Sequence, residues 1–199
     1  DPANLKRFKR EAEMASKIWH PNAVQIYDFD EDEAGDAFIS MEFIDGLPLS
    51  ELIKKDFPFA DERVVRIFIQ LCDVLAAGHK LGIVHRDLKP DNIMVLDLPT
   101  ENDFVKLLDF GLAKFAEHGK DNTQITQAGW ALGTPKYMAP EQCRGQKVGP
   151  YTDIYALGVL LYYMIAGVLP FEADSVAALM VKHTMEEPVP PSRRGRGVV

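Results

Sequence analysis

The first quarter of the chain combines one helical pattern with two strand-like apolar runs. Over residues 5–18, apolar side chains recur every three or four positions between charged ones, which predicts an amphipathic helix. The proline of "HPN" at 20–22 is expected to end this helix. Residues 23–30 and 36–44 then read as two strands, with an acidic, glycine-containing turn between them, and together they predict a hairpin.

A long amphipathic helix is predicted next, over residues 61–80. Asp61 is expected as its N-cap, and Gly82 lies just beyond its end. The residues expected on its inner face are Val64, Val65, Phe68, Leu71, Cys72 and Leu75. Two short apolar runs at 92–96 and 104–110, separated by turn residues, predict a second small hairpin.

The remainder of the chain is expected to be mainly helical. Residues 111–134 are polar and aperiodic, and a loop of that length within a compact domain is usually functional or disordered. Residues 155–171 carry no charge and are at the lower length limit for a membrane span, but a buried helix is also apolar on all sides. We favour the buried position, because a span usually needs about twenty residues. With a shorter helix at 174–185, the order of elements predicts an α+β fold.

Composition and charge exclude several classes of function. A chain of 199 residues, 47% of them hydrophobic, can form one substantial core or two lobes. The formal net charge of −8 argues against a nucleic-acid partner. Cys72 and Cys143 lie far apart and the five histidines are scattered, so no zinc site is expected and a reducing compartment is favoured. The charged first residues carry no signal peptide, and we expect a cytoplasmic domain.

The segment VHRDLKPDNIMV concentrates the residues that carry chemistry. Phosphoryl transfer requires an oriented acceptor hydroxyl and neutralised charge on the transferred oxygens. Asp87 can accept the proton of such a hydroxyl, and Lys89 can reach the same phosphate. Asn92, with Asp109 of the later LLDFG, offers the hard oxygen ligands that Mg²⁺ prefers, and Gly111 gives that turn conformational freedom.

From residue 5 to about 190 the chain resembles the eukaryotic-type (Hanks-type) serine/threonine protein kinase family, and its lean loops are similar to those of bacterial members. HRDLKPDN matches the catalytic loop at every fixed position, DFG matches the metal-binding turn, and GTPKYMAPE matches the end of the activation segment. The resemblance implies a bilobal α+β fold with a partial N-terminal lobe and hinge at 1–44. A helical C-terminal lobe at 45–190 and a tail at 191–199 would follow.

The resemblance also implies a function and a set of ligand contacts. The domain would transfer the γ-phosphate of ATP to serine or threonine hydroxyls of proteins, with Mg²⁺ or Mn²⁺ as the metal. Asp87 would be the catalytic base, Lys89 the γ-phosphate contact, and Asn92 and Asp109 the metal ligands. The implied nucleotide contacts are the gatekeeper Met41, the backbone of Glu42 and Ile44, and Met94 beneath the adenine.

Further positions take structural or regulatory roles by the same resemblance. Glu11 would pair with the ATP-binding lysine, and His85 and Phe110 would stack with Ala15 and Ile26. Asp153 would anchor the catalytic loop, which favours the buried position for residues 155–171. Thr134 is expected to bond toward Asp87 and Lys89. Thr123 and Thr126 are candidate phosphorylation sites, and Arg86 is the expected partner of such a phosphate. Glu141 is the last position of this group.

Some expected parts of the family pattern are missing or altered. No Gly-rich loop or strand lysine is present, and the small lobe lacks its first three strands. The large lobe lacks its last helices, so Glu141 is expected without its arginine partner. All four sampled catalytic residues are intact, which favours a truncated domain over a degenerate one, with little activity by itself. The hairpin between Asn92 and Asp109 is longer than usual, which is expected to affect only a surface loop.

Two other functions stay open on the sequence. A small-molecule phosphotransferase shares the catalytic aspartate and the metal ligands but would lack GTPKYMAPE, which serves protein substrates. A kinase-shaped scaffold without catalysis is the non-enzymatic alternative. The resemblance leaves open the membrane attachment of a longer parent protein.

Overall fold

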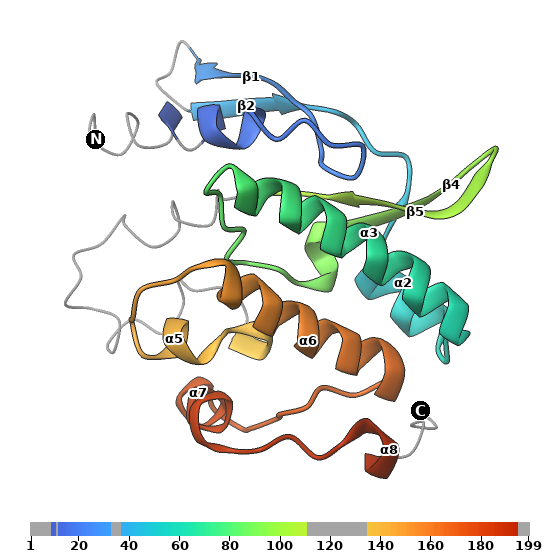
Figure 1. Cartoon of the computed structure of the whole chain (residues 1–199), viewed down its shortest axis with the longest axis vertical. Helices are drawn as coiled ribbons and strands as arrows, with labels where there is room; N and C mark the ends of the chain where they lie inside the picture. Colours follow the sequence, from blue (N-terminus) through green and yellow to red (C-terminus); the bar gives the residue numbers. More distant parts are fainter. Residues whose placement is uncertain (1–8, 11, 33–36, 111–134, 195–199) are drawn as a thin grey trace.

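The computed structural model describes residues 9–10, 12–32, 37–110 and 135–194 (Figure 1). At the N-terminal end, residues 9–10 and 12–16 are helical, as the spacing predicts. Strands β1 (Ile26–Glu31) and β2 (Ala37–Met41) form the predicted antiparallel hairpin, with Ile26 opposite Met41. This hairpin and the helix lie together at one end of the molecule.

The second sheet contains the hairpin predicted after the HRDLKPDN segment. Its strands are β3 (Leu47–Pro48), β4 (Ile93–Leu98) and β5 (Glu101–Leu107), in that order across the sheet. A parallel bridge between Ala23 and Leu107 connects it to the N-terminal part. The two parts also share one cluster of buried apolar side chains, so their relative position is fixed by packing as well as by backbone hydrogen bonds.

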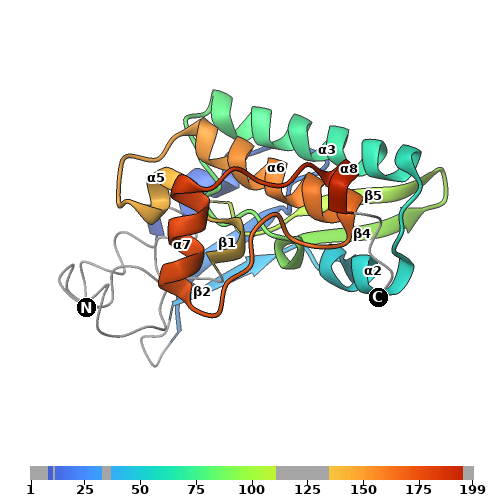
Figure 2. The same cartoon turned by 90° about the horizontal axis from the view of Figure 1, so that it is seen from below.

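The helices extend away from the first hairpin, and two of them pack against the second sheet. They are α2 (Leu49–Asp56), α3 (Asp61–Lys80), α5 (Pro140–Cys143), α6 (Pro150–Ala166), α7 (Val176–Met185) and α8 (Pro191–Arg194), with short 3₁₀ turns η1 (Pro90–Asn92) and η2 (Pro135–Tyr137). Figures 1 and 2 show α3 and α6 running side by side, and Figure 1 shows α7 and α8 at the end opposite β1 and β2.

Helix α6 contains most of the uncharged segment, and its inner face is buried. Leu157, Leu160 and Met164 are almost inaccessible to solvent, and Asp153 near its start is fully buried. Among the helices that the structure describes, none has both the length and the hydropathy to cross a membrane. Gly167 ends α6 with a φ of 73°, in the left-handed region that glycine adopts without strain.

The structure corrects two details of the helix predicted over residues 61–80. Helix α3 begins at Asp61, so its N-cap is Ala60, whose methyl side chain cannot accept a capping hydrogen bond. Its inner face is rotated from the predicted one: Val65 is 54% exposed and Cys72 is also exposed. The buried positions are instead Val64, Ile67, Leu71, Val74, Leu75 and Gly78.

Helix α2 and the short helix α8 were not predicted. In α2, the buried residues Leu49, Leu52 and Ile53 have helical spacing, but the element is only eight residues long. Helix α8 forms within the segment predicted as a tail.

Candidate active site

The segment that follows α3 is held by a buried carboxylate on α6. Asp153 accepts hydrogen bonds from the backbone N–H groups of His85 (2.9 Å) and Arg86 (2.8 Å). Its Oδ2 also lies 2.7 Å from Nε2 of His79. A buried carboxylate is tolerated when hydrogen bonds satisfy its oxygens, as they do here. The backbone of the two residues directly before Asp87 is therefore held in place by α6.

His85 connects this segment to the strand end that carries Asp109. Its ring is fully buried, and Nε2 lies 2.8 Å from the carbonyl oxygen of Leu108. A carbonyl can only accept, so Nε2 carries the proton and Nδ1 accepts from the backbone N–H of Asp87 at 3.3 Å. The ring also contacts Phe110 edge-on, with centroids 5.1 Å apart. Both nitrogens of His85 are thus engaged in holding the backbone, which favours a packed core histidine over a proton shuttle.

Asp87, Lys89 and Asn92 meet at the surface of this segment. Lys89 Nζ lies 2.7 Å from Asp87 Oδ2, and both side chains are partly exposed. The Asn92 side-chain amide nitrogen donates to the Asp87 carbonyl (2.9 Å) and to Asp87 Oδ2 (3.2 Å). Because both of these oxygens only accept, the amide nitrogen faces Asp87 and the Asn92 Oδ1 is left for another ligand.

Asp109 is brought beside this group by the backbone. The N–H of Leu108 donates to the carbonyl of Asn92 at 2.9 Å, so the two segments run together immediately before Asp109. Asp109 has a φ of 58°, an uncommon left-handed conformation for a residue other than glycine. Mg²⁺ usually binds proteins through one or two carboxylates together with substrate phosphates, and the Asn92 oxygen with Asp109 fits that pattern.

A small hollow lies between the two parts of the molecule, next to Asp109. It is lined by Met41, Asp109, Phe110, Leu107, Ala15, Ile18, Ala23, Val24 and Ile26. Met41 is 37% exposed at its edge. Phe110, Ala15 and Ile26, three of the four residues of the expected stack, line this hollow together, and Met41 lies at the same hollow.

The chain beyond Met41 borders the same region. The backbone N–H of Glu42 donates to the carbonyl of Gln25 at 2.8 Å, so its carbonyl is the group that could meet an adenine edge. Ile44 is half-buried, and Met94 lies on β4 opposite both Pro48 and Lys106. The Glu42 carboxylate pairs with Lys106 Nζ at 2.8 Å, an ion pair that sequence reasoning missed because no local pattern joins residues 64 positions apart.

Arg86 is held through both its backbone N–H and its backbone carbonyl. Arg86 has a φ of 71°, and its carbonyl accepts from the Gln142 side chain of α5 at 2.8 Å. Its Nε is buried and has no hydrogen-bond partner within the described ranges. Glu141, beside Gln142, accepts from the Thr152 hydroxyl at 2.6 Å, which links α5 to the start of α6.

Five of the predicted positions cannot be placed. Glu11, Gly111, Thr123, Thr126 and Thr134 lie outside the described residues. Among the residues that are described, no group of three or more His, Cys, Asp and Glu side chains is arranged to hold a metal ion. A metal bound by Asn92 and Asp109 would therefore depend on further oxygens from its substrate.

Comparison with known sequences identifies a matching family model and several similar proteins. Residues 1–192 match the family model described as protein kinase domain. The serine/threonine-protein kinase pkn3 of Myxococcus xanthus is 46% identical over 194 residues, covering 98% of this chain and 36% of the relative. The serine/threonine-protein kinase PknB of Mycolicibacterium smegmatis is 40% identical over 198 residues, covering 98% and 31%. The chain thus spans about a third of the length of these relatives.

Proposed function

The chain belongs to the protein kinase domain family, and from this premise we propose that it acts as the catalytic domain of a serine/threonine protein kinase. The reaction would transfer the γ-phosphate of ATP to a serine or threonine hydroxyl of a protein substrate. The observation that carries the proposal is the arrangement at Asp87, where an acid, a cation and an amide meet on backbone held by the buried Asp153.

Each side chain takes a role that its contacts allow. Asp87 orients the acceptor hydroxyl and accepts its proton, and Lys89, at 2.7 Å from Asp87, neutralises charge on the transferred phosphate. The oxygens of Asn92 and Asp109 would hold a divalent cation, Mg²⁺ or Mn²⁺. Such a cation neutralises charge on the phosphates when bound. Because His85 and Asp153 fix the backbone, the reacting groups are positioned before substrate arrives.

The nucleotide would bind between the two parts of the molecule. The carbonyl of Glu42 and the backbone of Ile44 would meet the adenine edge, with Met41 at the back and Met94 beneath the ring. Both cysteines are free thiols, which suits the reducing, ATP-containing cytoplasm that we propose as the location.

Regulation by a phosphate is a further part of the proposal. The buried Nε of Arg86, which has no hydrogen-bond partner among the described residues, motivates it, since a phosphothreonine at Thr123 or Thr126 could supply acceptor oxygens to this guanidinium. Mass spectrometry of the active full-length protein would test this, and active protein with neither threonine modified would exclude it. Thr134 is proposed to bond toward Asp87 and Lys89.

The test of the main proposal is Asp87→Asn in the full-length protein. Phosphate transfer from ATP to a generic protein acceptor should fall by at least about 10²-fold, because the proton acceptor is lost. Binding of Mg²⁺ with a non-hydrolysable ATP analogue should persist, since Asp87 is not among the proposed metal ligands. Transfer to small molecules alone would indicate a small-molecule phosphotransferase. Nucleotide binding without any transfer by the wild type would indicate a scaffold.

A further inference from the structure

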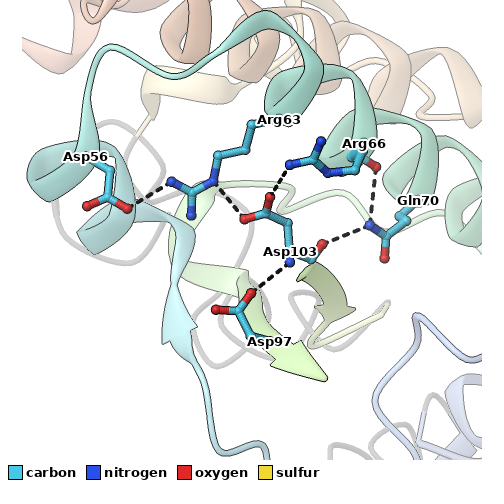
Figure 3. A network of polar contacts seen from close by, with 6 residues as sticks. All are labelled: Asp56, Arg63, Arg66, Gln70, Asp97 and Asp103. Carbon is cyan, nitrogen blue, oxygen red and sulfur yellow. Dashed lines mark hydrogen bonds and ion pairs between the residues drawn. The ribbon is translucent and has the colours of Figure 1, made fainter. Parts of the chain in front are cut away.

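The turn end of the β4–β5 hairpin contains a buried charge. Asp103 is only 4% exposed, although the hairpin was expected to differ from its relatives only in a surface loop. The register of the hairpin shifts between Leu96 and Leu98, and Asp103 has a φ of 57°. Bulges and left-handed residues redirect side chains, and the Asp103 carboxylate points at α3 rather than into solvent (Figure 3).

Two arginines of α3 hold this carboxylate. Arg63 Nε lies 2.7 Å from Oδ1 of Asp103, and Arg66 Nη2 lies 2.8 Å from Oδ2, so each oxygen has its own cation. Arg63 extends the contact to Asp56 at the end of α2, at 2.9 Å. The backbone N–H of Asp103 donates to Asp97 Oδ1 at 3.0 Å, which stabilises the turn conformation. A buried charge is tolerated when it is paired and hydrogen-bonded in this way.

Gln70, one turn further along α3, continues the attachment toward Asp109. Its Nε2 donates to the carbonyl of Asp103 at 2.9 Å, and its Oε1 accepts from the N–H of Val105 at 2.9 Å. The same Oε1 accepts from the side-chain amide of Asn22 at 2.8 Å, and that amide also donates to the carbonyl of Val105. Gln70 therefore holds β5 on both sides of Phe104 and joins it to the N-terminal part.

The opposite end of this hairpin carries both proposed metal ligands. Asn92 directly precedes β4, and Asp109 follows β5 by two residues. Ile93 and Leu107 are paired across the hairpin, so the two ends of β4 and β5 move together. Any tilt of the hairpin on α3 would change the separation of Asn92 and Asp109 from the other groups of the site.

We propose that Arg63, Arg66, Gln70 and Asp103, the hairpin clamp, are positioning residues for Asn92 and Asp109. The proposal rests on the proposed function, in which those two residues hold the divalent cation. The clamp residues touch neither substrate nor metal; they act by fixing the hairpin on α3. Small displacements are costly at such a site because ligand oxygens must approach the cation closely and with the right geometry.

The experiment compares clamp variants in the full-length protein. Asp103→Asn keeps the side-chain shape and removes the charge, and Arg66→Gln removes one cation from a half-exposed position where the protein should fold normally. Mg²⁺ affinity is measured by calorimetry in the presence of a non-hydrolysable ATP analogue, and the Mg²⁺ concentration for half-maximal transfer is measured alongside. We expect about tenfold weaker Mg²⁺ binding for Asp103→Asn, about threefold for Arg66→Gln, and recovery in Arg66→Lys.

The control is Lys17→Gln, which removes a solvent-exposed ion pair with Glu13 and should leave Mg²⁺ affinity unchanged. The KM for the protein acceptor should also stay unchanged in every variant. Unaltered Mg²⁺ affinity with a lower thermal midpoint would overturn the proposal, because the clamp would then only stabilise the fold. If the wild type binds Mg²⁺ with the analogue and the clamp variants bind it more weakly, the clamp stands even where no protein is phosphorylated. The absence of protein phosphorylation would then reject the proposed function but not the clamp.

Discussion

At the scale of single residues, the position of the Phe110 ring depends on a glycine, Gly78, at the neighbouring position of α3. Gly78 lies on the buried face of α3, and a Cβ placed there would come within 2.8 Å of Cε1 of Phe110. Carbon atoms do not approach so closely without displacement, so the ring must move if residue 78 gains a side chain. Because Phe110 follows Asp109 directly, a shift of the ring would be felt at the proposed metal ligand.

Gly78→Ala is therefore expected to lower activity while it favours the helix. Alanine is a better helix former than glycine by about 1 kcal/mol, which opposes the cost of displacing Phe110. We expect kcat to fall about tenfold with little loss of folded protein, measured by kinetics and thermal unfolding. Gly158→Ala in α6 is the matched control, since a Cβ there meets nothing within 4 Å and kcat should be unchanged. Equal kcat in the Gly78 variant and the wild type would contradict this reading of the contact.

At the scale of elements, α6 serves the site through the single carboxylate of Asp153. Its hydrogen bonds satisfy the buried backbone N–H of His85 and the partly buried backbone N–H of Arg86. Removing the acceptor leaves those groups unsatisfied, at about 1–3 kcal/mol for each one. The segment around Asp87 is thus attached to α6, a helix with many buried side chains.

Asp153→Ala should destabilise the protein and disturb the site together. We expect at least about 3 kcal/mol less free energy of unfolding, because three hydrogen-bonded contacts are lost from a buried position. Urea unfolding measures the loss. Ile154 of the same helix is 58% exposed, so Ile154→Ala is the control and should change the free energy of unfolding by much less.

The elements also show how far sequence reasoning reaches. Periodicity predicted the two hairpins and helices α3, α6 and α7, because those patterns are long or bounded by turns. The prediction that Val65 and Cys72 lie on the inner face of α3 was wrong, because tertiary packing, rather than local spacing, determines which apolar residues are buried. The motif around Asp87 predicted which residues would meet. The hairpin clamp could not be predicted from the sequence, because Arg63 and Asp103 are 40 positions apart and no local pattern links them.

At the scale of the whole molecule, the contact of α7 with η2 makes folding sensitive to pH. His183 of α7 is buried against Phe171, and its Nδ1 lies 2.7 Å from the hydroxyl of Tyr155, whose pKa burial raises to about 12. Burial lowers the pKa of His183 below its ordinary value, although the backbone carbonyls of Pro135 and Lys136 oppose the shift. The folded chain therefore keeps this histidine neutral where the unfolded chain would protonate it.

The sign of the resulting pH effect follows from linkage. Above the unfolded value near 6.5, His183 is neutral in both states and contributes no pH dependence. As the pH falls from there toward the lower folded pKa, the unfolded chain binds more protons and stability decreases. His183→Gln should flatten this part of the profile, measured by urea unfolding between pH 7 and about pH 5. A profile as steep as that of the wild type would show that other groups cause the acid sensitivity.

Asp153 also has a consequence for the order of events during synthesis. It lies 68 positions after His85, so a ribosome elongating at about 5–20 residues per second adds it about 3 to 14 seconds later. During that interval the segment around Asp87 has been made but lacks the carboxylate that holds its backbone. A nascent chain is thus unable to assemble the proposed active site one motif at a time. The proposed site is therefore complete only after α6 has been synthesised and buried.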